Sequence, residues 1–171
     1  DGDHVGDPGN VGIGIHFLRI VKNIIYNWTG SSSIEGNSSQ VTQLALKGNE
    51  ISNVVSGEAL FTHAQNSTTQ VVSSFANRFH STANASAWFG VGGTSLSLSA
   101  WKSAVGDSAS SAFSHNYPDP DRTVADYNAL NGGQSTHADF IARLLMQSKM
   151  SWNPKYTASA VNNYFREGFG R

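Results

Sequence analysis

The sequence predicts a mainly β fold: a right-handed parallel β-helix of about three to four coils, with a small α-helical cap at its C-terminal end. Three observations predict it. Short apolar runs separated by turn residues fill the chain to about residue 115, which is typical of strands. An internal repeat recurs within this part, and Ala, Leu, Asp, Arg and Tyr at helical spacing follow it.

The repeat is carried by residues 18–28, 44–54 and 72–82, each with an aliphatic residue five positions before an asparagine. The repeated asparagines are 26 and 28 residues apart, and they are Asn23, Asn49 and Asn77. A period of this length is typical of a solenoid in which each coil stacks on the next.

Two ladders are expected from this stacking. The residues two positions after each asparagine, Ile25, Ile51 and Phe79, would fill the interior as an apolar ladder. The asparagines tolerate the left-handed backbone of a sharp bend, and their side chains can hydrogen-bond to one another along the stack. A β-sandwich with accidental similarity between segments is the alternative.

The composition divides the chain into two predicted domains. Residues 1–114 would form the coils and end in a short helix at 98–105, between a capping serine and Gly106. Residues 115–171 would form a helical segment that packs on the last coil. Its expected helices cover residues 121–130, 136–149 and 157–167.

Composition also excludes several classes of function. The 171 residues include no cysteine, which excludes a disulfide scaffold, a thiolate zinc site and a thiol nucleophile. Charged residues make up 13% and the formal net charge is −1, so the sequence predicts neither a nucleic-acid nor a membrane partner.

The polar residues are mostly Ser, Thr, Asn, Gln and Gly, and this composition predicts a secreted or extracellular protein. Because the chain begins at Asp1 without methionine, we expect a mature form, a fragment or a partial chain.

The segment Lys-Asn-Ile-Ile-Tyr-Asn-Trp at 22–28 resembles the Asn-Asn-x-x-Tyr-Asn-Trp motif of bacterial pectate-lyase-like β-helix proteins. Gly-Asn-Glu-Ile at 48–51 is similar to the coil that follows in that family, and residues 97–108 resemble the motif where its β-helices end. The tail, from 119 to 169, is similar to the C-terminal segments of exported proteins of this fold. The resemblance implies the C-terminal portion of such a protein, associated with acidic polysaccharide.

The family's chemistry places two demands on a sequence. Its lyases cleave uronate polymers by β-elimination, with an arginine as base and calcium held by several carboxylates. The stretch where the family's arginine is expected, residues 7–14, contains none. The sequence therefore assigns no catalytic residue. Calcium is the one cofactor considered, at Asp1, Asp3 and Asp7, which carry hard oxygen ligands; a flexible terminal loop is the alternative.

Six residues are candidates for carbohydrate binding. The aromatic side chains of Tyr26, Trp28 and Trp88 can stack on the apolar faces of sugar rings, with core packing as the alternative. Lys22, Lys47 and Arg78 occupy nearby positions in the repeat and can form a basic stripe for uronate carboxylates, with a solvated surface as the alternative.

Three functions remain open at this point. The first is an exported module that is associated with acidic polysaccharide and lacks a complete catalytic site. The second is a structural subunit that stacks through its open N-terminal end into a filament, where an upstream portion of the chain or identical subunits cover that end. The third is an active calcium-dependent polysaccharide lyase.

Overall fold

The structure is a computed structural model that describes residues 17–28, 32, 34–36, 42–54, 57–63, 71–114 and 116–171. The chain divides into two compact units, residues 1–115 and residues 116–171. The predicted packing of the helical segment on the last coil stays a prediction.

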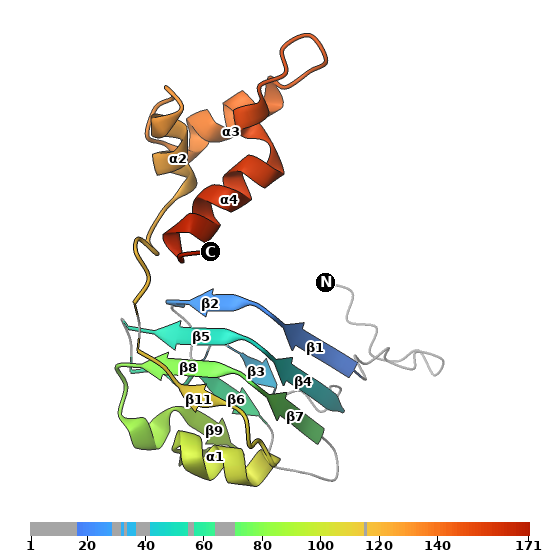
Figure 1. Cartoon of the computed structure of the whole chain (residues 1–171), viewed down its shortest axis with the longest axis vertical. Coiled ribbons are helices and arrows are strands. Elements are labelled where there is room, and N and C mark those ends of the chain that lie inside the picture. The colour runs from blue at the N-terminus through green and yellow to red at the C-terminus, as the bar shows by residue number, and fades with distance from the viewer. Residues whose placement is uncertain are drawn as a thin grey trace, which may run out of the picture. The chain divides into compact units, whose positions relative to one another are not determined.

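Unit 1 contains three small sheets of short strands (Figure 1). The first sheet has the order β1-β4-β7 and consists of β1 (Phe17–Val21), β4 (Gln43–Lys47) and β7 (Val71–Phe75). The second has the order β2-β5-β8-β11 and consists of β2 (Ile24–Tyr26), β5 (Glu50–Asn53), β8 (Arg78–Ser81) and β11 (Ser111–Ala112). The third has the order β3-β6-β9-β10 and consists of β3 (Glu35–Gly36), β6 (Phe61–His63), β9 (Phe89–Val91) and β10 (Thr94–Leu96). All neighbouring strands run parallel except β9 and β10.

The register of these sheets brings equivalent residues of the repeat side by side. Ile25 on β2 lies opposite Ile51 on β5, which lies opposite Phe79 on β8. In the first sheet Leu44 is the partner of both Leu18 and Val72. Parallel strands need a connection that returns the chain to the same end, and the repeat length supplies it.

The predicted fold class is nevertheless wrong. The chain is not a mainly β, right-handed parallel β-helix with a small helical cap. The described residues form three small, mostly parallel sheets of short strands together with four helices and are 31% helical, and nothing in this part of the chain indicates a solenoid or a closed sheet. The physical reason is that a repeat determines which segments pair, whereas the amount of strand depends on the sequence between them. Here each strand is only two to five residues long, and helix-favouring sequence takes over after Leu96.

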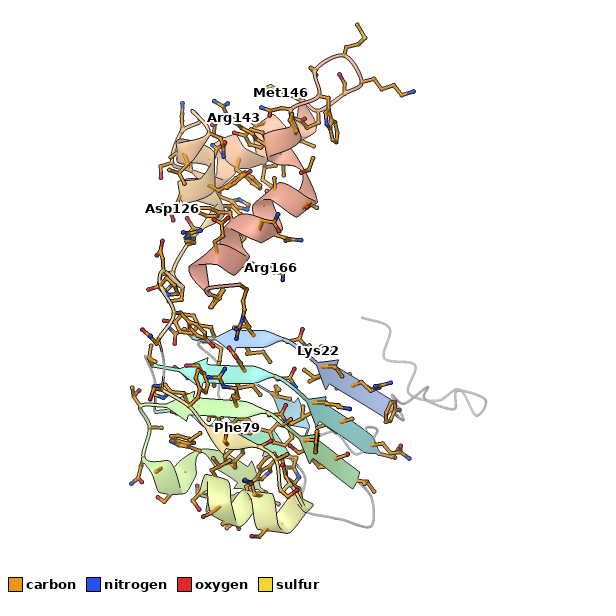
Figure 2. The ribbon with its side chains drawn as sticks, in the orientation of Figure 1. Lys22, Phe79, Asp126, Arg143, Met146 and Arg166 are labelled. Carbon is orange, nitrogen blue, oxygen red and sulfur yellow. The ribbon has the colours of Figure 1, made fainter. Side chains whose placement is uncertain are left out.

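Helix α1 (Leu98–Val105) supplies the largest side chain in the core of unit 1. The hydroxyl of Ser97 accepts from the backbone N–H of Ala100, and Gly106 ends the helix at a φ of 69°. Trp101 is fully buried and stacks on Phe89 with ring centroids 4.4 Å apart. Phe79, which Figure 2 labels on β8, meets Trp101 edge to face at 5.6 Å. Because α1 contacts β7 and β10, this end of unit 1 is covered by a helix.

Unit 2 consists of α2 (Val124–Leu130), α3 (His137–Leu145), a 3₁₀ turn at Pro154–Tyr156, and α4 (Ala158–Gly168). Its helices begin at threonine caps, and at α2 Thr123 and Asp126 form a capping box, so α2 starts later than the sequence predicted. Its core is an aromatic cluster of Tyr127, Phe140 and Tyr156. No helix among the described residues is long and apolar enough to cross a bilayer.

Candidate functional site

One surface of unit 1, the outer face of the sheet β1-β4-β7, combines exposed cations with exposed aromatic rings. Alternate residues along each strand point to opposite sides of a sheet. The inward set packs in or against the core and consists of Leu18, Ile20, Leu44, Leu46 and Val72. The outward set therefore includes Phe17, Arg19, Lys47 and Phe75, all of them exposed. We call these four residues, together with Lys22 at the end of β1, the cationic face.

Each strand-borne cation lies beside an aromatic ring. The Cζ atom of Arg19 lies 6.0 Å from the centroid of the Phe17 ring. The Nζ atom of Lys47 lies 5.7 Å from the centroid of Phe75, its direct partner on the neighbouring strand. Both rings stay 52% exposed. The strand register places the two rings at opposite ends of the sheet, so each of them belongs to a separate pair with its own cation.

Lys22 stands at a left-handed bend that repeats along the stack. Its φ is 57°, and the equivalent residues Gly48 and Ala76 have φ values of 64° and 54°. The side chain of Lys22 extends over Gly48, because a Cβ atom placed on that glycine would lie 3.7 Å from the Cγ of Lys22. Lys22 and Lys47 are therefore close neighbours, and the N–H of Lys22 donates to the carbonyl of Lys47 at 2.9 Å.

The cationic face has a uniform sign of charge. Strands β1, β4 and β7 carry two cations and no carboxylate, and Lys22 adds a third cation at the bend. Arginine and lysine on such a surface attract anionic groups, and arginine can hold a carboxylate with two parallel hydrogen bonds.

Arg78 does not belong to this surface. It begins β8 in another sheet, where its Nη1 lies 2.6 Å from Oε1 of Glu50 on β5. Its guanidinium also lies over the ring of Phe113, 4.6 Å from the centroid. The structure thus brings Lys22 and Lys47 together and separates Arg78, whose charge Glu50 compensates.

The aromatic residues predicted to bind sugar occupy different surroundings. Trp28 and Trp88 are partly buried and pack against the core, which favours the packing alternative. The indole N–H of Trp88 donates to the carbonyl of Ala83 at 3.2 Å, and that of Trp28 is buried without a hydrogen-bond partner in the described part of the chain. Tyr26 ends β2, half-buried, beside Ser52.

The three repeated asparagines form one hydrogen-bonded row. The backbone N–H of Asn23 donates to Oδ1 of Asn49, and that of Asn49 to Oδ1 of Asn77, each at 3.0 Å. The Nδ2 groups of Asn49 and Asn77 donate backwards to the carbonyls of Ile20 and Leu46. Each of these two asparagines is therefore bonded to the repeat before it and to the next residue of the row.

Two residues that the sequence interpretation missed continue this row. The N–H of Asn77 donates to the hydroxyl of Ser110 at 2.8 Å, and the N–H of Ser110 donates to Oδ1 of Asp107 at 2.8 Å. Burial alone would raise the pKa of Asp107, but hydrogen bonds from Ser110, Ser74 and the Ala109 backbone hold it below the usual value of 3.8. A carboxylate thus terminates the row at the end where α1 lies.

The predicted metal site receives no structural description. Asp1, Asp3 and Asp7 lie outside the described residues. Within the described ranges, no group of three or more acidic, histidine or cysteine side chains can hold a metal ion.

The sequence interpretation also missed Arg19, Phe17 and Phe75. The available signal was the alternation along the strands, because residues 17, 19 and 21 share one side of β1 when Leu18 and Ile20 face the core. The prediction instead compared repeat positions, which grouped Arg78 with Lys22 and Lys47.

Comparisons of this chain with protein-family models, with curated proteins and with solved structures find no match.

Proposed function

We propose that this protein binds acidic polysaccharide through the cationic face and has no catalytic role there. The observation that carries the proposal is the placement of Arg19, Lys22 and Lys47 near exposed rings, on or beside three strands whose sequences contain no carboxylate. Uronate polymers combine carboxylates with apolar ring faces, and this surface offers a complement to both.

The arrangement of the cations on neighbouring strands of one sheet suits a polymer rather than a small molecule. Neighbouring strands lie about 4.8 Å apart, so the side chains of three strands present a shallow array rather than an enclosed pocket. A polymer lying across the strands can reach Arg19 on β1 and Lys47 on β4 through different sugar units. The resemblance to pectate-lyase-like proteins favours galacturonate units.

Two alternatives receive less support. A calcium-dependent lyase needs clustered carboxylates beside a free basic residue, and in the described ranges Glu50 is instead engaged with Arg78. Head-to-tail stacking into a filament needs an accessible surface at both ends of unit 1, and α1 contacts β7 and β10 at one of them.

The test is binding of polygalacturonate, measured by isothermal titration calorimetry with the full chain. We expect binding that weakens as ionic strength rises from low salt to about 0.15 M, because screening reduces the attraction between exposed charges. Dextran, which has no carboxylate, serves as the neutral polymer and should not bind.

The variant that removes the charge is Arg19→Gln/Lys22→Gln/Lys47→Gln, for which we expect roughly a tenfold loss of affinity, at about 0.5 kcal/mol per exposed charge. Arg166→Gln, an exposed cation of unit 2, is the matched control and should bind as the parent does. Equal affinity of the triple variant and the parent, or equal binding of dextran, would overturn the proposal. Release of unsaturated uronate would show instead that the protein is a lyase.

A further inference from the structure

Unit 2 exposes a group of large apolar side chains at the end of α3 and in the turn that follows. The exposed fractions are 39% for Ile141, 81% for Leu145, 68% for Met146, 95% for Met150 and 63% for Trp152. Ile141 and Leu145 are four residues apart and share one side of the helix. We call these five residues the apolar turn; Figure 2 shows Met146 where α3 ends.

The core of unit 2 does not need these side chains. Tyr127, Phe140 and Tyr156 form that core, and Val124, Leu144, Val161 and Tyr164 pack against it. Soluble proteins rarely expose so many large apolar groups together unless the surface contacts something.

The turn holds its shape through its own polar groups. The hydroxyls of Ser148 and Ser151 lie 2.8 Å apart, and the Ser151 hydroxyl donates to the carbonyl of Met146 at 2.8 Å. The side chain of Gln147 accepts from the N–H of Asn153 at 2.8 Å and donates to the carbonyl of Arg143. Because these hydroxyl and amide groups already have hydrogen-bond partners within the turn, the apolar turn can enter an apolar medium at a lower desolvation cost.

Two exposed lysines flank the apolar turn. From residue 140 to residue 166 the sequence contains four cations and no Asp or Glu, and one of the cations, Arg143, is paired with Asp139 at 2.9 Å. Lys149 and Lys155 are exposed and have no ion-pair partner among the described residues. The net charge of −1 for the whole chain, which argued against a membrane partner, conceals this local excess of positive charge.

We propose that the apolar turn inserts into the interface of an anionic lipid bilayer, with Lys149 and Lys155 at the headgroups. Apolar residues with tryptophan on a surface flanked by lysine are typical of shallow membrane attachment, which is reversible and does not span the bilayer. The turn after α3 projects from unit 2 as a loop (Figure 1), which suits shallow insertion into lipid better than the roughly 800 Å² per partner that a stable protein interface buries. Lysines near an anionic surface add about 1 kcal/mol of attraction each.

The experiment is co-sedimentation of the full chain with vesicles of phosphatidylcholine alone and of equimolar phosphatidylcholine and phosphatidylglycerol. We expect binding to the phosphatidylglycerol vesicles, and at least a tenfold weaker partition for Met150→Ser/Trp152→Ser, since two large apolar groups would no longer leave water. Leu130→Ser is the matched control, because Leu130 is 72% exposed on α2 and lies outside the turn. It should partition as the parent does.

A second measurement locates the contact. Quenching of tryptophan fluorescence by brominated lipid should fall in Trp152→Phe, which keeps the side chain apolar, while its partition stays close to that of the parent. Absence of binding to both vesicles, or an equal loss in Leu130→Ser, would overturn the inference. So would self-association of the parent in the ultracentrifuge that Met150→Ser/Trp152→Ser abolishes, because a second copy of the chain would then be the partner.

Discussion

Both units of the molecule bury asparagine, and they do so in opposite ways. In unit 1, Asn49 and Asn77 are fully buried members of a row in which each residue bonds to the next. In unit 2, Asn128 is fully buried and single. Its amide donates to the carbonyl of Gln134 and to Asp139, and its Oδ1 accepts from the hydroxyl of Tyr156 at 2.6 Å.

The two units differ in whether other side chains can replace a lost hydrogen-bond partner. A row offers substitute partners, since the hydroxyls of Ser74 and Ser110 also lie within 3.4 Å of the amide nitrogen of Asn77. Asn128 instead joins three segments of unit 2 by itself: the loop at Gln134, α3 through Asp139, and the 3₁₀ turn through Tyr156. We therefore expect the loss of Asn128 to cost more than the loss of any one residue of the row.

The largest expected effect is that of Asn128→Ala. It leaves a carboxylate, a tyrosine hydroxyl and a carbonyl without their buried partner, and we expect the free energy of unfolding of unit 2 to fall by about 4 kcal/mol. Hydrogen exchange followed by mass spectrometry measures this for peptides from α2 and α3. Unit 1 peptides provide the internal control, and a loss below about 1 kcal/mol would contradict the central role of Asn128.

Gly133→Ala should have the next largest effect, through the same residue. A Cβ atom on Gly133 would lie 2.4 Å from Nδ2 of Asn128 and 2.5 Å from its Cγ and Oδ1, so the amide must move away from its partners. We expect a loss of about 3 kcal/mol. The substitution should cost little more in the Asn128→Ala background; if the two losses simply add, the contact with Asn128 is not the cause.

Within the row, the expected effect depends on position. Asn77→Ala removes a buried residue that bonds to both neighbours, and we expect a loss of about 2 kcal/mol, moderated by the nearby serines. Asn23 is exposed, and among the described residues its amide bonds within its own turn and to Asn49, so Asn23→Ala should cost about 0.5 kcal/mol. Chemical denaturation measures the loss of unfolding free energy in both variants. Equal losses would show that the position of an asparagine in the row does not determine its contribution to stability.

This contrast also explains what the sequence could predict. The row is visible in the sequence because asparagine recurs at a regular interval, and α1 lies at the residues that its caps and spacing predicted. Asn128 leaves no such trace, because a single buried asparagine looks like any polar residue of a helix. Ser110 and Asp107 were missed for a related reason: they continue the row with different side chains, so the period no longer shows them.

The fold class was predicted wrongly for another reason. The repeat predicted which segments pair but not that the strands would stay short and the chain become 31% helical. To predict the site, one must know on which side of its strand each residue lies, and the interval between the asparagines alone does not give this. Arg19 and Lys47 share a face because Leu18 and Leu46 face the core.

The smallest expected effect is that of acid on the two carboxylates in these networks, Asp139 in unit 2 and Asp107 in unit 1. In unit 2 the pKa of Asp139 is lowered to about 2 by hydrogen bonds from the Gln134 backbone, the Asn128 amide and Arg143. A carboxylate with a lowered pKa in the folded state stabilises the protein at pH values above 3.8, the ordinary pKa of aspartate, and this contribution disappears as the pH falls toward 2.

Thermal unfolding between pH 5 and pH 2 should therefore show unit 2 losing stability with falling pH. In Asp139→Asn this dependence should be weaker, whereas Asp121→Asn, an exposed control, should keep it. Asp107 in unit 1 also has a lowered pKa and should act in the same direction, so exchange data are needed to separate the units. If Asp139→Asn unfolds with the pH dependence of the parent, Asp139 is not the titrating group and Asn128 holds unit 2 together without it.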